Sequence, residues 1–179
     1  MADDLQSRLQ TQMRKAYWDL LEKEASCRPL GEKTVGWIVQ LYTELRGRLA
    51  GLTPRRADLH QELAAAMDTG ALEAQLRDPA GVPPADLRRV VEYVYTKLLN
   101  LCAPAQDQAL RCDRAVLLGL LDTGYDVTLG TFMVELLQRV HRAVDEIEAM
   151  IEQFRRGRVP GAGAGAGSTV PTSMRAGRG

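Results

Sequence analysis

The chain has few aromatic residues, no net charge and no long apolar segment. Aromatic residues make up 5% of its 179 residues, and 23 basic residues balance 23 acidic ones. A net charge of zero argues against a protein that binds nucleic acid through bulk positive charge. No apolar run approaches the roughly 18 residues that a membrane-spanning helix needs. The first four residues, MADD, do not resemble a signal peptide. We therefore expect no transmembrane segment and no specific binding of nucleic acid.

Cysteine is also scarce. Cys27, Cys102 and Cys112 are odd in number and widely spaced, unlike a disulfide framework or the short Cys-x-x-Cys spacing of structural zinc sites. We expect reduced thiols that pack as small apolar groups, no metal and no cofactor. Reduced thiols indicate a cytoplasmic location, with the nucleus as the alternative.

Catalytic motifs are missing. No glycine-rich phosphate loop follows a strand, because no strand is predicted. Neither His60 nor His141 has a glutamate three residues before it, as a di-iron helical bundle requires. One alternative is a helical enzyme with Cys102 as nucleophile, for which only Arg111 and Arg114 lie near in sequence. We predict that the protein is not an enzyme.

Composition changes near the end of the chain. Residues 155–179 carry five arginines and no acidic residue, which leaves 18 basic and 23 acidic residues in 1–154. After Gly157 the sequence is mostly Gly, Ala, Ser, Thr, Pro and Arg, a composition that cannot bury a core. We predict a helical domain over 1–156 and a disordered tail over 157–179. The acidic clusters at 22–24 and 145–148 are interpreted as solvated helix faces.

Apolar residues recur at three- and four-residue steps through most of 1–156, which is typical of α-helices. In the first helix, an apolar stripe from Leu5 to Leu21 contains Tyr17 and leaves Trp18 at its edge. Proline and glycine positions predict a first helix from Asp3 or Asp4 to Arg28, a second that ends at Gly51, and others over 54–66, 71–77, 84–101, 104–122 and 126–156. The predicted fold class is all-α, an antiparallel bundle of about seven helices.

Three segments carry a family resemblance. The first runs from Lys15 to Leu21, the second from Val91 through the Leu-Cys-Ala-Pro turn to Asp107, and the third pairs Asp122 with Asp126. In order and spacing they resemble the T-complex protein 11 family, in which an aromatic-Trp-Asp segment opens the domain and a Leu-Cys-Ala-Pro-Ala-Arg-Asp turn ends a middle helix. Gln106 and Gln108 replace the family's arginine and acid. Family members usually continue with further helices, so the resemblance describes a divergent or truncated member.

The resemblance implies a non-enzymatic regulatory or adaptor protein. Members of this family are linked to cyclic-AMP and protein kinase A signalling, and they act through protein partners. The residues that match the family motifs are expected to shape the core or to contact a partner, and we favour the structural role. They are Tyr17, Trp18, Asp19, Leu101, Cys102, Ala103, Pro104, Asp107, Asp122 and Asp126.

A self-associating helical scaffold is the alternative function. It would use the long helix 126–156 as a coiled-coil seam. The apolar stripe of that helix drifts from a strict heptad, which argues against a long seam. The oligomeric state is left open by the sequence.

Overall fold

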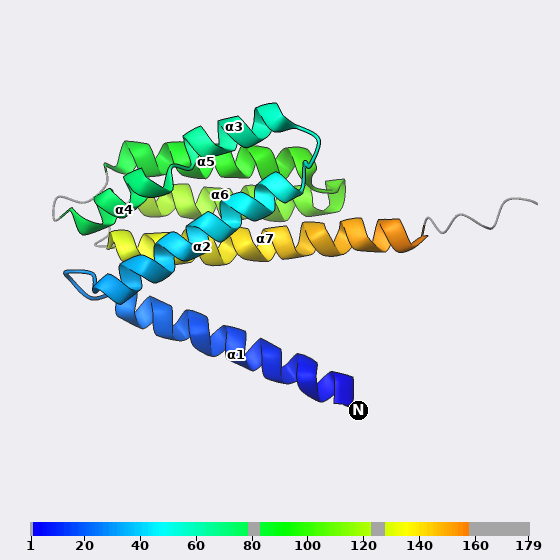
Figure 1. The fold of residues 1–179 in the computed structure, drawn as a ribbon, viewed down its shortest axis with the longest axis horizontal. Helices are drawn as coiled ribbons and strands as arrows, with labels where there is room; N and C mark the ends of the chain where they lie inside the picture. Colours follow the sequence, from blue (N-terminus) through cyan, green and yellow to red (C-terminus); the bar gives the residue numbers. More distant parts are fainter. Residues whose placement is uncertain (1, 79–82, 123–127, 158–179) are drawn as a thin grey trace, which may run out of the picture.

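The computed structural model describes residues 2–78, 83–122 and 128–157, with side chains from Arg8 onward, and these residues are almost entirely helical (Figure 1). The predicted all-α class is confirmed. The described residues contain no strand and form seven helices: α1 (Ala2–Ala25), α2 (Glu32–Gly51), α3 (Ala57–Ala66), α4 (Thr69–Arg77), α5 (Pro84–Leu101), α6 (Pro104–Asp122) and α7 (Leu129–Gly157). The predicted tail after Gly157 lies outside the described residues.

Helix α5 follows its predicted bounds, and the structure corrects the starts of four other helices. Helix α1 begins before Asp3 and Asp4, and α3 begins after a turn in which Arg56 N donates to Thr53 O. Helix α4 begins earlier than predicted because the Asp68 carboxylate accepts hydrogen bonds from the first backbone N–H groups of the helix. Helix α7 begins later, since the Thr128 hydroxyl accepts from Thr131 N and so caps the helix.

Helices α5, α6 and α7 run alternately in opposite directions, and α2 crosses over them (Figure 1). Helix α2 contacts α3, α4 and α7, and α5 packs chiefly on α6. The core lies between these helices, and Ile38, Leu98, Leu117 and Leu137 are all fully buried in it. The apolar stripe that predicted each of these helices is the face that the structure buries.

Helix α7 contributes much of the core. Its apolar stripe from Phe132 to Ile147 is buried against other helices of the same chain. Only the last turns expose apolar surface, chiefly Phe154. A coiled-coil seam along most of α7 would therefore have to displace the protein's own core.

Helix α1 differs from the prediction. Only its C-terminal part packs on the body, through Leu21 and Ala25, which are fully buried. Most of the predicted apolar stripe instead faces solvent: Leu9 is 57% exposed, Met13 64% and Leu20 48%, whereas Leu21 at the end of the stripe is buried. The expectation that this stripe joins the core is wrong for Leu9, Met13 and Leu20, because the face that packs on the body through Trp18, Leu21 and Ala25 lies about 140° round the helix at 100° per residue.

The end of α1 lies very close to the start of α7. The Thr128 hydroxyl donates a 3.0 Å hydrogen bond to Ala25 O. A Cβ built on the buried Gly130 would lie 2.6 Å from the same carbonyl oxygen. The absence of a side chain at position 130 lets the two helices meet at this point. Among the described helices, none has the length and apolarity that a membrane span requires.

Candidate functional site

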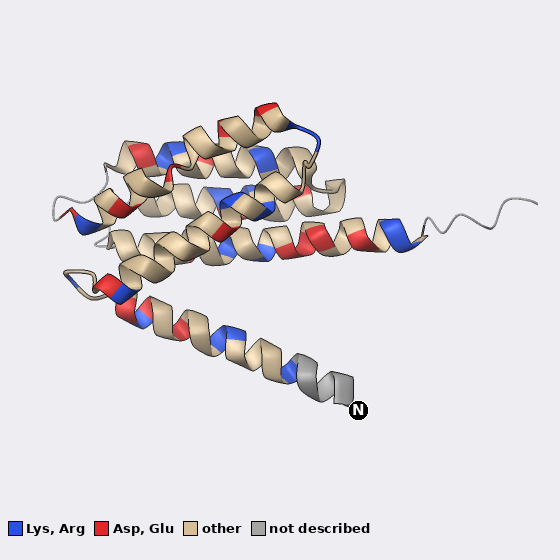
Figure 2. Cartoon of the chain, in the orientation of Figure 1, with Lys and Arg blue, Asp and Glu red and all other residues tan. Residues whose placement is uncertain are grey.

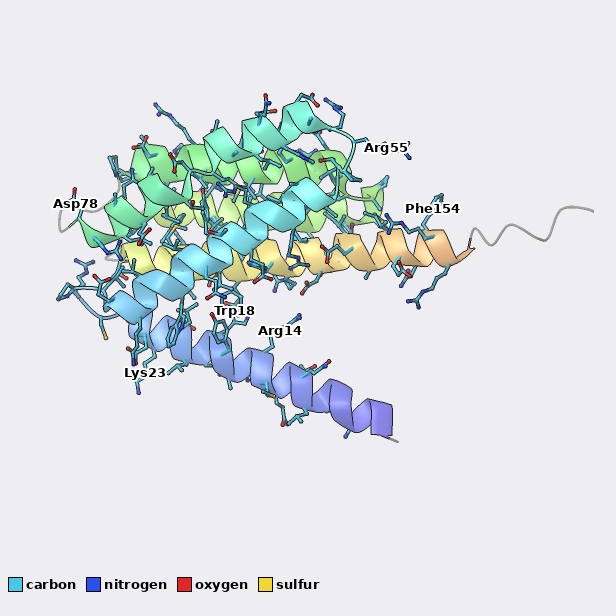
Figure 3. All side chains as sticks on the ribbon, viewed as in Figure 1. Arg14, Trp18, Lys23, Arg55, Asp78 and Phe154 are labelled. Carbon is cyan, nitrogen blue, oxygen red and sulfur yellow. The ribbon has the colours of Figure 1, made fainter. Side chains whose placement is uncertain are left out.

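A groove of about 410 Å³ lies where α1, α2 and α7 meet. Figure 3 shows Trp18 and Arg14 of α1 projecting toward the other two helices. The groove combines aromatic, basic and acidic side chains, and its lining is Thr11, Arg14, Lys15, Tyr17, Trp18, Leu41, Glu44, Arg48, Gln138, His141, Arg142 and Asp145. Two of the motif residues, Tyr17 and Trp18, therefore lie in one surface depression.

Arg48 of α2 and Arg14 of α1 both bind carboxylates of α7, and the shared Asp145 connects the three helices. Nη2 of Arg48 donates to Asp145 Oδ1 at 2.7 Å and to Glu148 Oε2 at 2.6 Å, both on α7. Asp145 also accepts from Nη1 of Arg14 on α1 at 2.8 Å. The Arg48 side chain is only 19% exposed, so its pairs are screened less than ordinary surface ion pairs.

His141 lies beneath this ion-pair network and is buried. Its Nε2 is 3.1 Å from Leu41 O, which can only accept, so Nε2 carries the proton. Its Nδ1 then accepts from Arg48 Nη1 at 3.1 Å. Burial lowers the pKa of His141, and the Arg48 charge acts in the same direction, although Leu41 O, Glu44 and Asp145 oppose them. The geometry describes a neutral histidine with both ring nitrogens hydrogen-bonded.

Tyr17 was expected within the apolar stripe of α1 and Trp18 at its edge, but Trp18 is the more buried of the two. Trp18 is half-buried, and its ring lies 6.2 Å from the His141 ring. Tyr17 is more exposed and meets Trp37 of α2 edge-on at 6.4 Å. Both tryptophans of the chain thus lie around one junction, and Trp18 faces the body while Tyr17 lies on the outer flank.

The Leu-Cys-Ala-Pro segment forms the corner between α5 and α6. Leu101 ends α5, Cys102 is extended, and Pro104 is the first residue of α6. Ala103 N donates to the Gln106 side-chain oxygen at 3.3 Å, and Gln106 N donates to Ala103 O at 2.9 Å. Gln106 therefore caps the start of α6 in the manner of a capping box.

Asp107 and Cys102 both lie at this corner between α5 and α6. Asp107 pairs with Arg111 one turn later at 2.7 Å, in the first turn of α6 as predicted. Cys102 is half-buried and packs against the core. Burial raises the pKa of its thiol, and the Asp107 carboxylate raises it further. The other two cysteines, Cys27 and Cys112, are exposed, so the prediction of packed thiols holds for Cys102 alone.

The remaining acidic motif residues are dispersed. Asp19 is exposed on α1, and Asp122 at the end of α6 pairs with Arg88 of α5. Asp126 lies outside the described residues. The structure brings Tyr17 and Trp18 to the α1–α2–α7 junction, whereas the Leu101–Asp107 segment lies at the α5–α6 corner. The matching segments thus do not form one site.

Sequence reasoning missed Arg48 and the roles of Asp145 and Glu148. The predicted solvated face holds for Glu146 and Glu148, which are exposed, but Asp145 and Glu148 also pair with arginines of other helices. Figure 2 shows the acidic segments along the second half of α7. Local charge pattern gives no signal for a pair that lies 97 positions apart in the sequence.

No group of three or more His, Cys, Asp or Glu side chains in the described ranges could hold a metal ion. No solved structure matches the chain. The family model of T-complex protein 11 matches residues 1–153.

Proposed function

Because the chain belongs to the T-complex protein 11 family, we propose that it is a non-enzymatic adaptor that acts by protein–protein contact. The groove between α1, α2 and α7 is the proposed contact surface. We further propose, on the family resemblance alone, that its partners belong to cyclic-AMP and protein kinase A signalling. Its proposed place of action is the cytoplasm or the nucleus.

The groove itself is the observation that supports this proposal. Exposed Lys15 and Glu44 provide charges of both signs at its rim, while Trp18 and Leu41 provide half-buried apolar surface. Such a mixture of a central aromatic and a polar rim is typical of protein interfaces. A partner would dock on a preformed surface, because the Arg48 network already holds the three helices together.

The non-enzymatic character has one chemical support. Cys102 was the alternative nucleophile, and a nucleophilic cysteine needs a lowered pKa. Its pKa is instead raised by burial and by Asp107.

The test is capture of purified protein kinase A subunits on the immobilised full chain, with and without cyclic AMP. Reversing the rim charges with Lys15→Glu and Glu44→Lys should weaken capture by roughly tenfold or more, because like charges then meet across the interface. Glu92→Lys is the matched control, because Glu92 is an exposed residue of α5 outside the groove. This variant should bind as the unmodified chain does. Equal binding by all variants would exclude the groove, and no capture of either subunit would exclude the signalling link.

A further inference from the structure

A second apolar surface lies on the opposite side of α1 from the groove. Six large apolar residues are exposed in the described part of the chain. Four of them belong to α1: Leu9, Met13, Tyr17 and Leu20. Leu9, Met13, Ala16 and Leu20, all exposed, follow steps of four, three and four residues. This spacing is that of the a and d positions in a coiled coil. We call these four residues the α1 stripe.

We propose that the α1 stripe is a self-association surface, on which α1 of a second copy of this chain packs in antiparallel orientation. The inference goes beyond the proposed function, because the stripe and the groove lie on different faces of α1. The seam predicted along α7 is occupied by the protein's own core from Phe132 to Ile147.

The stripe is symmetric about its own midpoint. Leu9 and Leu20 are equally distant from the point between Arg14 and Lys15, and so are Met13 and Ala16. A two-fold axis that passes between two antiparallel copies of α1 at this level brings Leu9 of each copy against Leu20 of the other, and Met13 against Ala16. A C2 interface must be self-complementary in this way, and here a large side chain meets a small one at the centre.

Charge on the flank of the stripe also fits an antiparallel pair. Arg8 and Asp19 lie within about 20° of each other around α1, at 100° per residue. The two-fold axis places Arg8 of one copy about 3 Å along the helix axis from Asp19 of the other. Two opposite-charge pairs therefore form at the flank of the antiparallel pair, because its two-fold axis keeps Arg8 of one copy and Asp19 of the other on the same side of the seam. Gln10 and Gln12 are the neutral neighbours of the stripe.

The polar side of α1 argues against a membrane surface as the occupant. Helices that lie on anionic membranes carry mostly Lys and Arg on that side. Arg14 and Lys15 share the polar side of α1 with Asp19 and Glu22. Figure 2 shows both signs of charge along the helix.

The area of the stripe predicts a weak dimer. An exposed apolar patch of a few hundred Å² marks an interaction surface, but a stable interface buries about 800 Å² on each partner. One helix face falls short of that area. The association should therefore depend on concentration, with dimers at high and monomers at low micromolar concentration.

Sedimentation velocity of the full chain over that range tests the proposal. The mass should rise from 19.7 kDa toward twice that value. Met13→Glu should raise the dissociation constant roughly tenfold or more, because a carboxylate would enter the apolar seam. Two matched controls place the same change on other exposed apolar residues, Val116→Glu on α6 and Phe154→Glu on α7, and both should dimerise normally. Circular dichroism verifies that each variant keeps its helices.

Orientation is tested by charge reversal. Arg8→Glu should weaken the dimer, and the double variant Arg8→Glu with Asp19→Arg should restore it. A monomer at every concentration, or a monomer that sediments with anionic lipid vesicles, overturns the proposal. Loss of the dimer in Phe154→Glu but not in Met13→Glu also overturns it, since α7 would then be the interface.

Discussion

Replacing Gly130 by alanine should separate the close contact between α1 and α7. The added Cβ would lie 2.6 Å from Ala25 O and 2.6 Å from a methyl group of Leu30. The carbonyl belongs to the backbone of the packed end of α1 and cannot move aside by a rotamer change. Overpacking of this kind costs about 1–3 kcal/mol. It opposes the gain of roughly 0.5–1 kcal/mol that alanine gives over glycine within a helix.

Gly47→Ala is the matched control. Position 47 is exposed on α2, and a Cβ there meets nothing within 4 Å. This variant should show the helix gain alone, so the two variants should differ by about 1–3 kcal/mol in the free energy of unfolding. Urea unfolding followed by circular dichroism measures that difference.

Tryptophan fluorescence reports where the change occurs. Trp18 and Trp37 are the two tryptophans of the chain, and both lie around the α1–α2–α7 junction. Emission of Gly130→Ala should shift to longer wavelength as α1 is displaced, while Gly47→Ala keeps the original spectrum. If both variants gain the same stability with unchanged emission, the end of α1 does not lie against Gly130 and the described junction is refuted.

Three further perturbations test other parts of the structure. Tyr95→Phe should leave the free energy of unfolding unchanged or raise it by up to about 1 kcal/mol, because the buried Tyr95 hydroxyl has no hydrogen-bond partner among the described residues; a clear loss in urea unfolding would mean that the hydroxyl is bound. The chain should lose stability as pH falls below about 6.5, since the lowered pKa of His141 makes the unfolded chain take up the proton first; His141→Gln should flatten that part of the profile, and identical profiles would assign the effect elsewhere. Alkylation by iodoacetamide, followed by mass spectrometry, should modify Cys102 more slowly than exposed Cys27, because burial raises the Cys102 pKa; a faster Cys102 would revive a nucleophilic role.

Local sequence signals define the helices of this protein. Helix α5 follows its predicted bounds, and Pro104 starts α6 where expected, because apolar period, proline and glycine act over one or two turns. Membership of the T-complex protein 11 family, which the Leu-Cys-Ala-Pro segment and the Tyr-Trp-Asp segment indicated, is confirmed by the family match. The boundary errors at α4 and α7 arose where a side chain, Asp68 or Thr128, caps the helix.

Which face of each helix is covered depends on how the helices pack on one another. The α1 stripe has the same period as the stripe of α5, yet it faces solvent, because Trp18 and Leu21 on another face are the residues that meet α7. Arg48 pairs with Asp145 and Glu148 of α7, which lie about a hundred residues later in the sequence. A periodic pattern identifies an apolar face but carries no information about what packs on it, and that information exists only once distant segments have come together.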